Sequence, residues 1–264
     1  MSETFLDKIL AAKRAELRET GTRSSALTDR ELAELGARLP KPRDFIGALR
    51  AGPAPAIIAE FKRASPSAGE LRADADPRHI ATLYAAGGAT CMSVLTDRHF
   101  RGSFDDLRTV RQTVTLPLLC KDFILEKTQI VEAKRVGADC VLLIAAALPP
   151  PQLRGLLEFA RQLDMQALCE TRDEHEIDRA MAAGAQLIGV NARDLQTFEL
   201  DPDRCARLRK HVPASFTYVA ESGIRGADDV VRLRDAGVDA VLIGSYLMQA
   251  QNPGEALRRL ILEL

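Results

Sequence analysis

The feature that most constrains the fold is a regular alternation of short apolar runs with charged, amphipathic segments of helical length. The apolar runs recur at residues 56–61, 91–95, 117–120, 139–145, 165–169, 186–190, 216–220 and 239–243. Several intervening segments end at a glycine just before the next run, and glycine accepts the left-handed conformation that ends a helix. These glycines are Gly88, Gly137, Gly184 and Gly237. The pattern therefore predicts a strand and then a helix, eight times over.

Alternating strands and helices require parallel strands joined by right-handed crossovers. Eight such units match a closed (βα)8 or TIM barrel of the α/β class. An open doubly wound sheet is the alternative, and the sequence disfavours it because no G-x-G-x-x-G follows the first strand and no loop resembles a P-loop. We expect residues 1–264 to form a single barrel domain.

Residues 1–46 have no place in this alternation. They read as one or two helices, with Phe5, Leu6 and Ile9 on one apolar stripe and with Gly21 and Pro40 as breaks. We expect this helical extension to pack on the barrel, either closing its bottom or leaning over its mouth.

Helix starts are marked by a capping side chain followed by a proline. Such pairs suit the first turn, because the side chain accepts from a free backbone N–H group and proline needs no hydrogen bond there. They occur at Asp76-Pro77, Asp201-Pro202 and Asn252-Pro253.

Composition narrows the class of function. The formal net charge is −1 with acids and bases interspersed, so we expect no nucleic-acid or membrane partner. The N-terminal segment is too charged for a signal peptide and no twenty-residue apolar run exists, which predicts a cytoplasmic protein. Five cysteines without C-x-x-C and four unpaired histidines predict neither a metal site nor disulfides. We expect a monomer without a cofactor.

Polar residues end most of the predicted strands. In a barrel of this type the active site lies at the C-terminal ends of the strands. A salt bridge could explain each charge alone, but a purely structural cluster would have to overcome the desolvation of every member. The second strand contributes only Thr96 and the fourth nothing evident. The polar ends of the other strands are Glu60 with Lys62, Lys121, Glu170, Asn191, Glu221 with Ser222 and Gly223, and Gly244 with Ser245.

Alternation along a strand adds two details. Glu60 and Lys62 are two residues apart, so their side chains leave an extended strand on the same face. Cys120 and Cys169 precede Lys121 and Glu170, so they face the helices, and neither is predicted to be a nucleophile.

The turns after the seventh and eighth strands predict a phosphate site. Gly223 and Gly244 leave backbone N–H groups unobstructed, and Ser245 adds a hydroxyl before a helix. Barrels of this class commonly hold a phosphate at this position, which predicts a phosphorylated small-molecule substrate.

These segments resemble the indole-3-glycerol phosphate synthase family over essentially the whole chain. The resemblance rests on several motifs in order, together with the leading LDKILAAKRAEL. The motifs are IIAEFKRASPS at 57–67, SVLTD at 93–97, PLLCKDFI at 117–124, GADCVLLIAA at 137–146, LCE at 168–170, IGVNARDL at 188–195, VAESGI at 219–224 and LIGSYLM at 242–248.

The resemblance implies a carboxy-lyase of tryptophan biosynthesis. Its substrate, 1-(2-carboxyphenylamino)-1-deoxyribulose 5-phosphate, loses carbon dioxide and water to give indole-3-glycerol phosphate. The resemblance makes Lys121 the general acid for the ketone oxygen, with a pKa lowered by Lys62 and burial. It implies that Glu170 supports the developing cation and proton transfer, and that Glu60 and Lys62 serve dehydration and orientation.

The same resemblance implies the binding residues. Asn191, grouped with the catalytic residues, would bind the anilino carboxylate or sugar hydroxyls together with Arg193. The remaining implied contacts are Ser65 in the neighbouring loop, Phe100, Phe123 and Leu195 around the aromatic ring, Glu221 and Ser222 on the far side, and Gly223, Gly244, Ser245 and Lys62 on the phosphate.

Two other functions remain open at this point. A strand-end lysine such as Lys121 is also what a Schiff-base aldolase requires. A non-catalytic phosphosugar-binding barrel would keep the phosphate turns, although the presence of Glu60, Lys62 and Glu170 weighs against it. In the synthase, the loop from Arg63 through Gly69 is predicted to be mobile and to close over the substrate.

Overall fold

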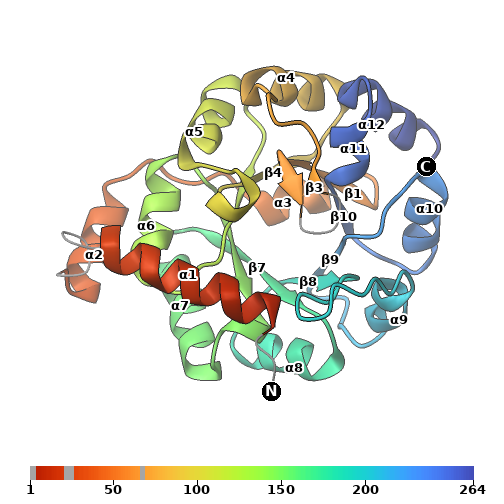
Figure 1. The fold of residues 1–264 in the computed structure, drawn as a ribbon. Coiled ribbons are helices and arrows are strands. Elements are labelled where there is room, and N and C mark those ends of the chain that lie inside the picture. The colour runs from red at the N-terminus through yellow and green to blue at the C-terminus, as the bar shows by residue number, and fades with distance from the viewer. Residues whose placement is uncertain (1–3, 21–26, 66–68) are drawn as a thin grey trace.

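The computed structural model describes residues 4–20, 27–65 and 69–264. Eight parallel strands close into a barrel in the order β1-β10-β9-β8-β7-β6-β5-β4 (Figure 1). The predicted closed barrel is confirmed. The strands are β1 Ala56–Phe61, β4 Cys91–Leu95, β5 Leu118–Lys121, β6 Cys140–Ile144, β7 Gln166–Thr171, β8 Leu187–Asn191, β9 Thr217–Glu221 and β10 Ala240–Ile243.

The strands are apolar and buried almost throughout, as expected for parallel strands covered by helices. The outer layer comprises α4 Pro77–Gly87, α5 Phe104–Thr113, α6 Lys127–Arg135, α7 Pro150–Gln162, α8 Glu174–Ala182, α9 Arg204–Arg209, α10 Ala227–Asp235, α11 Ser245–Gln249 and α12 Pro253–Leu262. Short 3-10 turns, η1 Arg98–Phe100 and η2 Ala145–Ala147, follow β4 and β6.

The predicted helix ends are largely confirmed. Each glycine predicted to end a helix has a positive φ, from 80° at Gly237 to 100° at Gly137. Asp76 and Asn252 cap α4 and α12 as expected. The helix start predicted at Asp201-Pro202 is wrong. Asp201 accepts from the N–H group of Asp203 in a turn, and α9 begins only at Arg204.

The N-terminal extension forms three helices: α1 Phe5–Thr20, α2 Asp29–Ala37 and α3 Phe45–Ala51. The sequence predicted one or two, and α3 was missed because it lies at the boundary with the first strand. Gly21, the predicted first break, lies outside the described residues. Figure 1 shows α1 in front of the barrel and α3 behind it, so the extension contacts both ends of the barrel.

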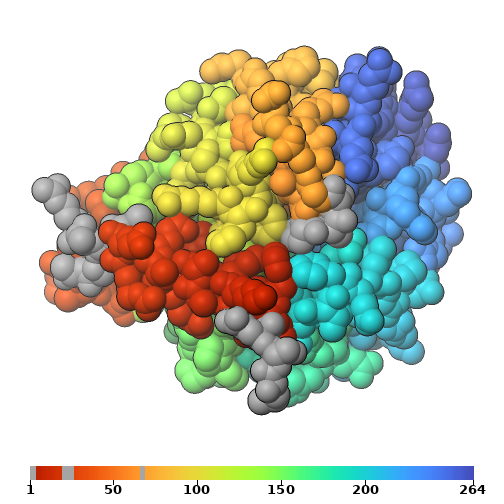
Figure 2. All heavy atoms as spheres, viewed as in Figure 1, coloured from red at the N-terminus to blue at the C-terminus, as the bar shows by residue number. Residues whose placement is uncertain are grey.

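The bottom contacts are specific. The N–H group of Ile46 donates to Gln166 Oε1 at the start of β7, at 2.8 Å. Arg50 Nε donates to Thr217 Oγ1 at the start of β9, at 2.7 Å. At the other end, α1 contacts the loops after β4 and β8. In Figure 2 the red spheres of α1 lie against the yellow and cyan spheres of these segments. Phe5 packs edge-on against Phe198, with 4.5 Å between ring centroids.

The barrel closes at a seam between β1 and β10, where Ala56 pairs with Ala240 and Ala59 with Ile243. Outside the seam α12 packs on α4. A Cβ atom on Gly87 would lie 2.7 Å from the carbonyl oxygen of Gly254. The two helices therefore approach closely because both positions lack a side chain.

Candidate active site

A cavity of about 300 Å³ opens at the C-terminal ends of the strands. Every residue that the family resemblance implied for the site lines it, from Glu60 on β1 to Ser245 at the start of α11, whereas Thr96 does not line it and donates to Asp122 instead. The structure thus brings together side chains that are up to 185 positions apart in the chain, because parallel strands direct their C-terminal ends to one rim.

Lys121 lies among carboxylates. Its Nζ atom is 2.5 Å from Glu221 Oε2 and 3.4 Å from Glu170 Oε2. Asn191 Nδ2 donates to Glu170 Oε1 at 3.1 Å and so orients that carboxylate. The ends of β5, β7, β8 and β9 each supply one of these groups.

This arrangement reverses the expected pKa of Lys121. Burial lowers the pKa of the ammonium group. The negative charges of Glu221, Glu170 and Glu60 together raise that pKa by more, so the net shift is upward. The expectation of a lowered pKa is wrong because Lys121 is paired with Glu221 rather than repelled by Lys62. In this state Lys121 is a stable ammonium ion.

For Glu221, in contrast to Lys121, the surroundings disfavour the charged form. Burial, with the charges of Glu170 and Glu60, outweighs the attraction of Lys121 and raises the pKa of Glu221 to about 7. Its Oε1 atom is buried and has no hydrogen-bond partner within the described part of the chain. Glu221 thus has an unused hydrogen-bond acceptor beside the cavity.

Glu60 and Lys62 form a second ion pair, with 2.7 Å between Glu60 Oε1 and Lys62 Nζ. Burial raises the pKa of Glu60, but the charges of Lys62 and Lys121 lower it overall. The pair lies against Gly244, where a Cβ atom would stand 2.2 Å from Glu60 Oε1. Gly244 has an ordinary negative φ, so it gives space to the ion pair rather than a special turn.

Gly189 on β8 plays the same part for Glu221 and was not identified from the sequence. A Cβ atom there would lie 2.3 Å from Glu221 Oε1. Its only sequence signal is a glycine inside an apolar strand, which often marks close approach of another group.

The cavity has an apolar wall. Phe100 and Phe123 stack with 6.3 Å between centroids and 22° between planes, and Leu195 also lines the space. Phe198 and Leu200, in the loop after β8, also line the cavity and were not predicted from the sequence. Leu142 and Ile144 line it from the fourth strand, β6, for which no site residue was predicted. Apolar residues at a strand end look like ordinary core, so these gave no signal.

The turn after β9 holds two consecutive residues in the left-handed conformation, with φ of 67° at Ser222 and 79° at Gly223. Such a turn points successive N–H groups to one side and favours an anion. Ser245 begins α11 directly after β10. Arg225, which also lines this side, was not predicted.

Two predicted loop residues also reach the cavity. Ser65 belongs to a small antiparallel hairpin of β2 Ala64–Ser65 and β3 Gly69–Glu70. The guanidinium of Arg193 donates to the carbonyl oxygen of Phe198 and so supports its own loop. Residues 66–68, which belong to the predicted closing loop, lie outside the described residues.

Comparison with known proteins gives one family. The family model for indole-3-glycerol phosphate synthase matches residues 6–260. A protein of that name from Mycolicibacterium gilvum is 47% identical over 261 residues, which cover 98% of this chain and 94% of that protein. Another from Polaromonas naphthalenivorans is 47% identical over 260 residues, 97% of this chain and 98% of its own.

Solved structures at low identity share the fold. The 3-hexulose-6-phosphate synthase of Salmonella typhimurium has a TM-score of 0.63 at 13% identity and covers 79% of this chain and 98% of its own. Thiamine phosphate pyrophosphorylase from Pyrococcus furiosus has a TM-score of 0.61 at 18% identity, over 83% of this chain and 97% of its own.

Barrel and cavity together define an enzyme of the (βα)8 class, with lysines and carboxylates gathered at the C-terminal rim. The chain belongs to the indole-3-glycerol phosphate synthase family. In the part of the chain that the structure describes, no helix has the length and apolar character to span a membrane.

Proposed function

We propose that this protein closes the indole ring of 1-(2-carboxyphenylamino)-1-deoxyribulose 5-phosphate and releases indole-3-glycerol phosphate, carbon dioxide and water, as a step of tryptophan biosynthesis. The observation that carries the proposal is a paired ammonium group, Lys121, in a cavity that has an aromatic wall on one side and anion-binding turns on another. Each feature matches one part of this substrate.

Lys121 acts as the general acid in ring closure. The ring carbon that bears the carboxylate attacks the ketone carbon, and the ketone oxygen takes a proton from the Lys121 ammonium. The raised pKa keeps that ammonium protonated. A forming alkoxide is a stronger base than the carboxylates, so it can still accept the proton. Glu170, 3.4 Å from Nζ, stabilises the positive charge that develops on the ring system.

Decarboxylation and dehydration follow. The C–C bond to the carboxylate breaks and its electron pair restores the aromatic ring. The new hydroxyl then leaves as water, while a proton is lost from the neighbouring ring carbon. The Glu60–Lys62 pair supplies one base and one acid for this step. Asn191 orients Glu170 and, with Arg193, meets the substrate's carboxylate or hydroxyls.

The remaining roles concern binding. Phe100, Phe123 and Leu195 hold the aromatic ring, and the turn at Ser222 and Gly223 binds the phosphate. Gly244, Ser245 and Lys62 complete the phosphate site, while Ser65 and Glu221 close the other sides. Arg63 to Gly69 forms the loop that we expect to close over bound substrate, and unchanged protease sensitivity with and without substrate analogue would contradict that closure.

The ion pairs of Lys121 argue against a Schiff-base aldolase, because carbonyl addition needs a free amine rather than an ammonium. We further propose that the protein acts as a monomer in the cytoplasm. The monomer is supported by a surface on which, across the described residues, only Leu200 and Leu262 are large, apolar and exposed, and Leu200 belongs to the cavity.

The test is an assay with the anilino-deoxyribulose phosphate. The sequence contains no tryptophan, so indole fluorescence can be followed without a tryptophan background. Appearance of indole fluorescence with release of one carbon dioxide supports the synthase. A borohydride-trapped adduct at Lys121, without indole formation, would favour the aldolase.

A further inference from the structure

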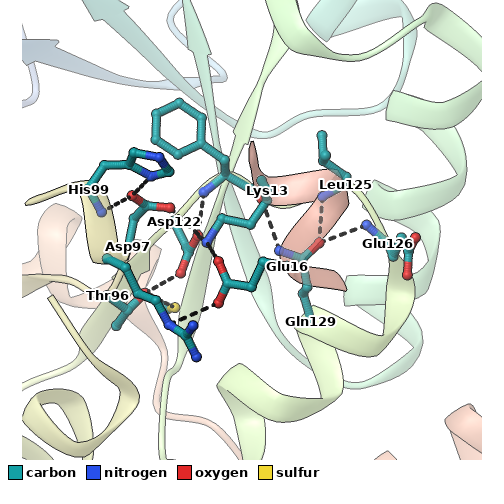
Figure 3. Close-up of polar contacts among 12 residues, drawn as sticks. Lys13, Glu16, Thr96, Asp97, His99, Asp122, Leu125, Glu126 and Gln129 are labelled. Atoms are coloured by element: carbon teal, nitrogen blue, oxygen red, sulfur yellow. Dashed lines mark hydrogen bonds and ion pairs between the residues drawn. The ribbon is translucent and has the colours of Figure 1, made fainter. Parts of the chain in front are cut away.

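A buried lysine of the N-terminal extension lies between the two loops that carry the stacked aromatic residues. Lys13 on α1 is only 3% exposed. Its Nζ atom is 2.7 Å from Asp97 Oδ2, after β4, and 2.7 Å from Asp122 Oδ1, after β5 (Figure 3). Both aspartates are buried as well. One cation from outside the barrel therefore joins two loops at its mouth.

Asp97 controls the conformation that presents Phe100. Its Oδ1 atom accepts from the N–H group of His99 at 2.8 Å and lies 2.9 Å from His99 Nδ1. Asp97 is thus the N-cap of η1, whose last residue is Phe100. The backbone N–H group of Phe100 also donates to the carbonyl oxygen of Asp97. The position of Phe100 follows from that of Asp97.

Asp122 plays the same part for the second aromatic residue. Its Oδ1 atom, which contacts Lys13, also accepts from the N–H group of Phe123 at 2.7 Å. Its Oδ2 atom accepts from Thr96 Oγ1 at 2.8 Å, which ties the two loops together a second time. Asp122 also directly follows Lys121. The Lys13 contact thus acts on the side chain that sets the backbone of Phe123.

The charges make this contact hard to replace. Burial lowers the pKa of Lys13, but Asp122 and Asp97 raise it to a net upward shift, so Lys13 is an ammonium ion. Without it the two buried carboxylates would face each other with no ammonium group between them, and like charges in such a site repel strongly. The loops would then separate or rearrange, and with them the aromatic wall.

The docking of α1 does not depend on Lys13 alone. Leu6, Ile9 and Leu10 are buried against the barrel, and Phe5 packs on Phe198. Replacing Lys13 with an apolar side chain of similar length therefore leaves the helix its apolar contacts. The effect of the charge can thus be separated from loss of the helix.

We propose that Lys13 is a positioning residue, which sets the spacing of Phe100 and Phe123 through Asp97 and Asp122 and so determines how tightly the site holds the aromatic part of its ligand. The inference rests on the proposed function, because the aromatic part is the anilino ring of the substrate and the indole of the product. A purely structural lysine would affect the stability of the fold and leave the affinity of the folded protein for the ring unchanged.

The experiment compares product binding in wild type and Lys13→Met. Indole-3-glycerol phosphate is titrated by its own fluorescence, and glycerol 3-phosphate, which lacks the ring, is titrated by calorimetry. We expect the Kd for the product to rise about tenfold in the folded variant, since an aromatic contact contributes a free energy of about that size to binding. The Kd for glycerol 3-phosphate should stay within about twofold, because that ligand has no ring for Phe100 and Phe123 to hold.

Lys127→Met is the matched control. Lys127 joins the same N-terminal extension to the barrel through Asp29, at 2.5 Å, but does not line the cavity. Its product affinity should equal that of wild type. A product Kd that is unchanged in Lys13→Met, or raised equally in both variants, would overturn the proposal.

A second variant keeps the test decisive if Lys13→Met fails to fold. Lys13→Met combined with Asp97→Asn has the same formal charge at this cluster as wild type but no bridging cation. Weakened product binding in the double variant supports the positioning role, and wild-type affinity contradicts it. Wild type that neither turns over substrate nor binds the product would contradict the proposed function, and with it the premise on which the role of Lys13 rests.

Discussion

The two ends of the barrel are both rich in polar side chains, yet they use them differently. At the bottom, charged groups bond to backbone groups as well as to one another: Asp139 accepts from the N–H groups of Arg43 and Leu118 and pairs with Arg111, and Arg43 donates to the carbonyl oxygens of Val114 and Leu116. In the cavity at the mouth, the carboxylates of Glu60, Glu170 and Glu221 bond to the ammonium groups of Lys62 and Lys121 rather than to backbone, and Glu221 keeps one buried oxygen without a partner among the described residues.

The difference indicates what each end is for. Side chains bonded to backbone fix the chain and have no capacity left for a ligand. Side chains bonded only to one another can exchange partners when a ligand arrives. Substitutions should therefore affect turnover at the mouth and stability at the bottom, and the following predictions test this division in order of decreasing effect.

Lys121→Met should lower kcat by about 10²–10⁴-fold, the usual contribution of a general acid. The fold should persist, because an apolar side chain replaces a desolvated charge, although Glu221 and Glu170 lose their cation. Turnover is followed by indole fluorescence, and phosphate binding by calorimetry. Wild-type turnover in this variant would remove Lys121 from the mechanism, and Lys127→Met again serves as the control.

Ser245→Asp should raise KM by about tenfold or more with a smaller change in kcat, because a carboxylate near the substrate phosphate repels it. The matched control is Ser215→Asp, which adds the same charge at an exposed position at the other end of the barrel. An unchanged KM in Ser245→Asp would move the phosphate site away from the turn after β10.

Glu221→Gln should change how stability depends on pH. In wild type the pKa of Glu221 is about 7 in the folded protein and near 4.5 when unfolded. The unfolded chain thus releases its proton first, and wild type loses stability as the pH rises from 4.5 through 7. The variant lacks this loss, so its stability relative to wild type should increase over that range by about 1–3 kcal/mol. Urea unfolding at pH 5 and pH 8 measures it, and a constant difference would contradict the raised pKa.

Arg50→Ala, at the bottom, should lower the free energy of unfolding by about 1–2 kcal/mol, since it removes donors to Thr217 and Ser215. Its kcat and KM should match those of wild type. Arg30→Ala breaks an exposed pair with Glu34 on α2 and should cost about 0.5 kcal/mol or less. Loss of turnover in a fully folded Arg50→Ala protein would contradict the claim that the bottom of the barrel affects stability and not turnover.

The sequence was sufficient for the barrel because the alternation of apolar runs and helical segments marks all eight strands, although it did not show α3 or the start of α9. It was also sufficient to identify most candidate site residues, since residues such as Lys121 and Glu221 directly follow or end apolar runs. The sequence could not show which side chains form ion pairs, because the carboxylate that meets Lys121 depends on the order of the strands in the closed barrel. The expected lowering of the Lys121 pKa was wrong for that reason. Lys13 was equally hidden, because a lysine on an amphipathic helix looks solvent-exposed until its packing is known.

The seam between β1 and β10 has a consequence for biosynthesis on the ribosome. β1 pairs with β10, which lies nearly 180 residues later in the chain. Until residues 240–243 have left the exit tunnel, the growing sheet has two open edges of apolar strand, which are templates for unwanted pairing. The barrel can therefore close only late in translation, and chaperone dependence should fall sharply once β10 and α12 are available to cover β1 and α4.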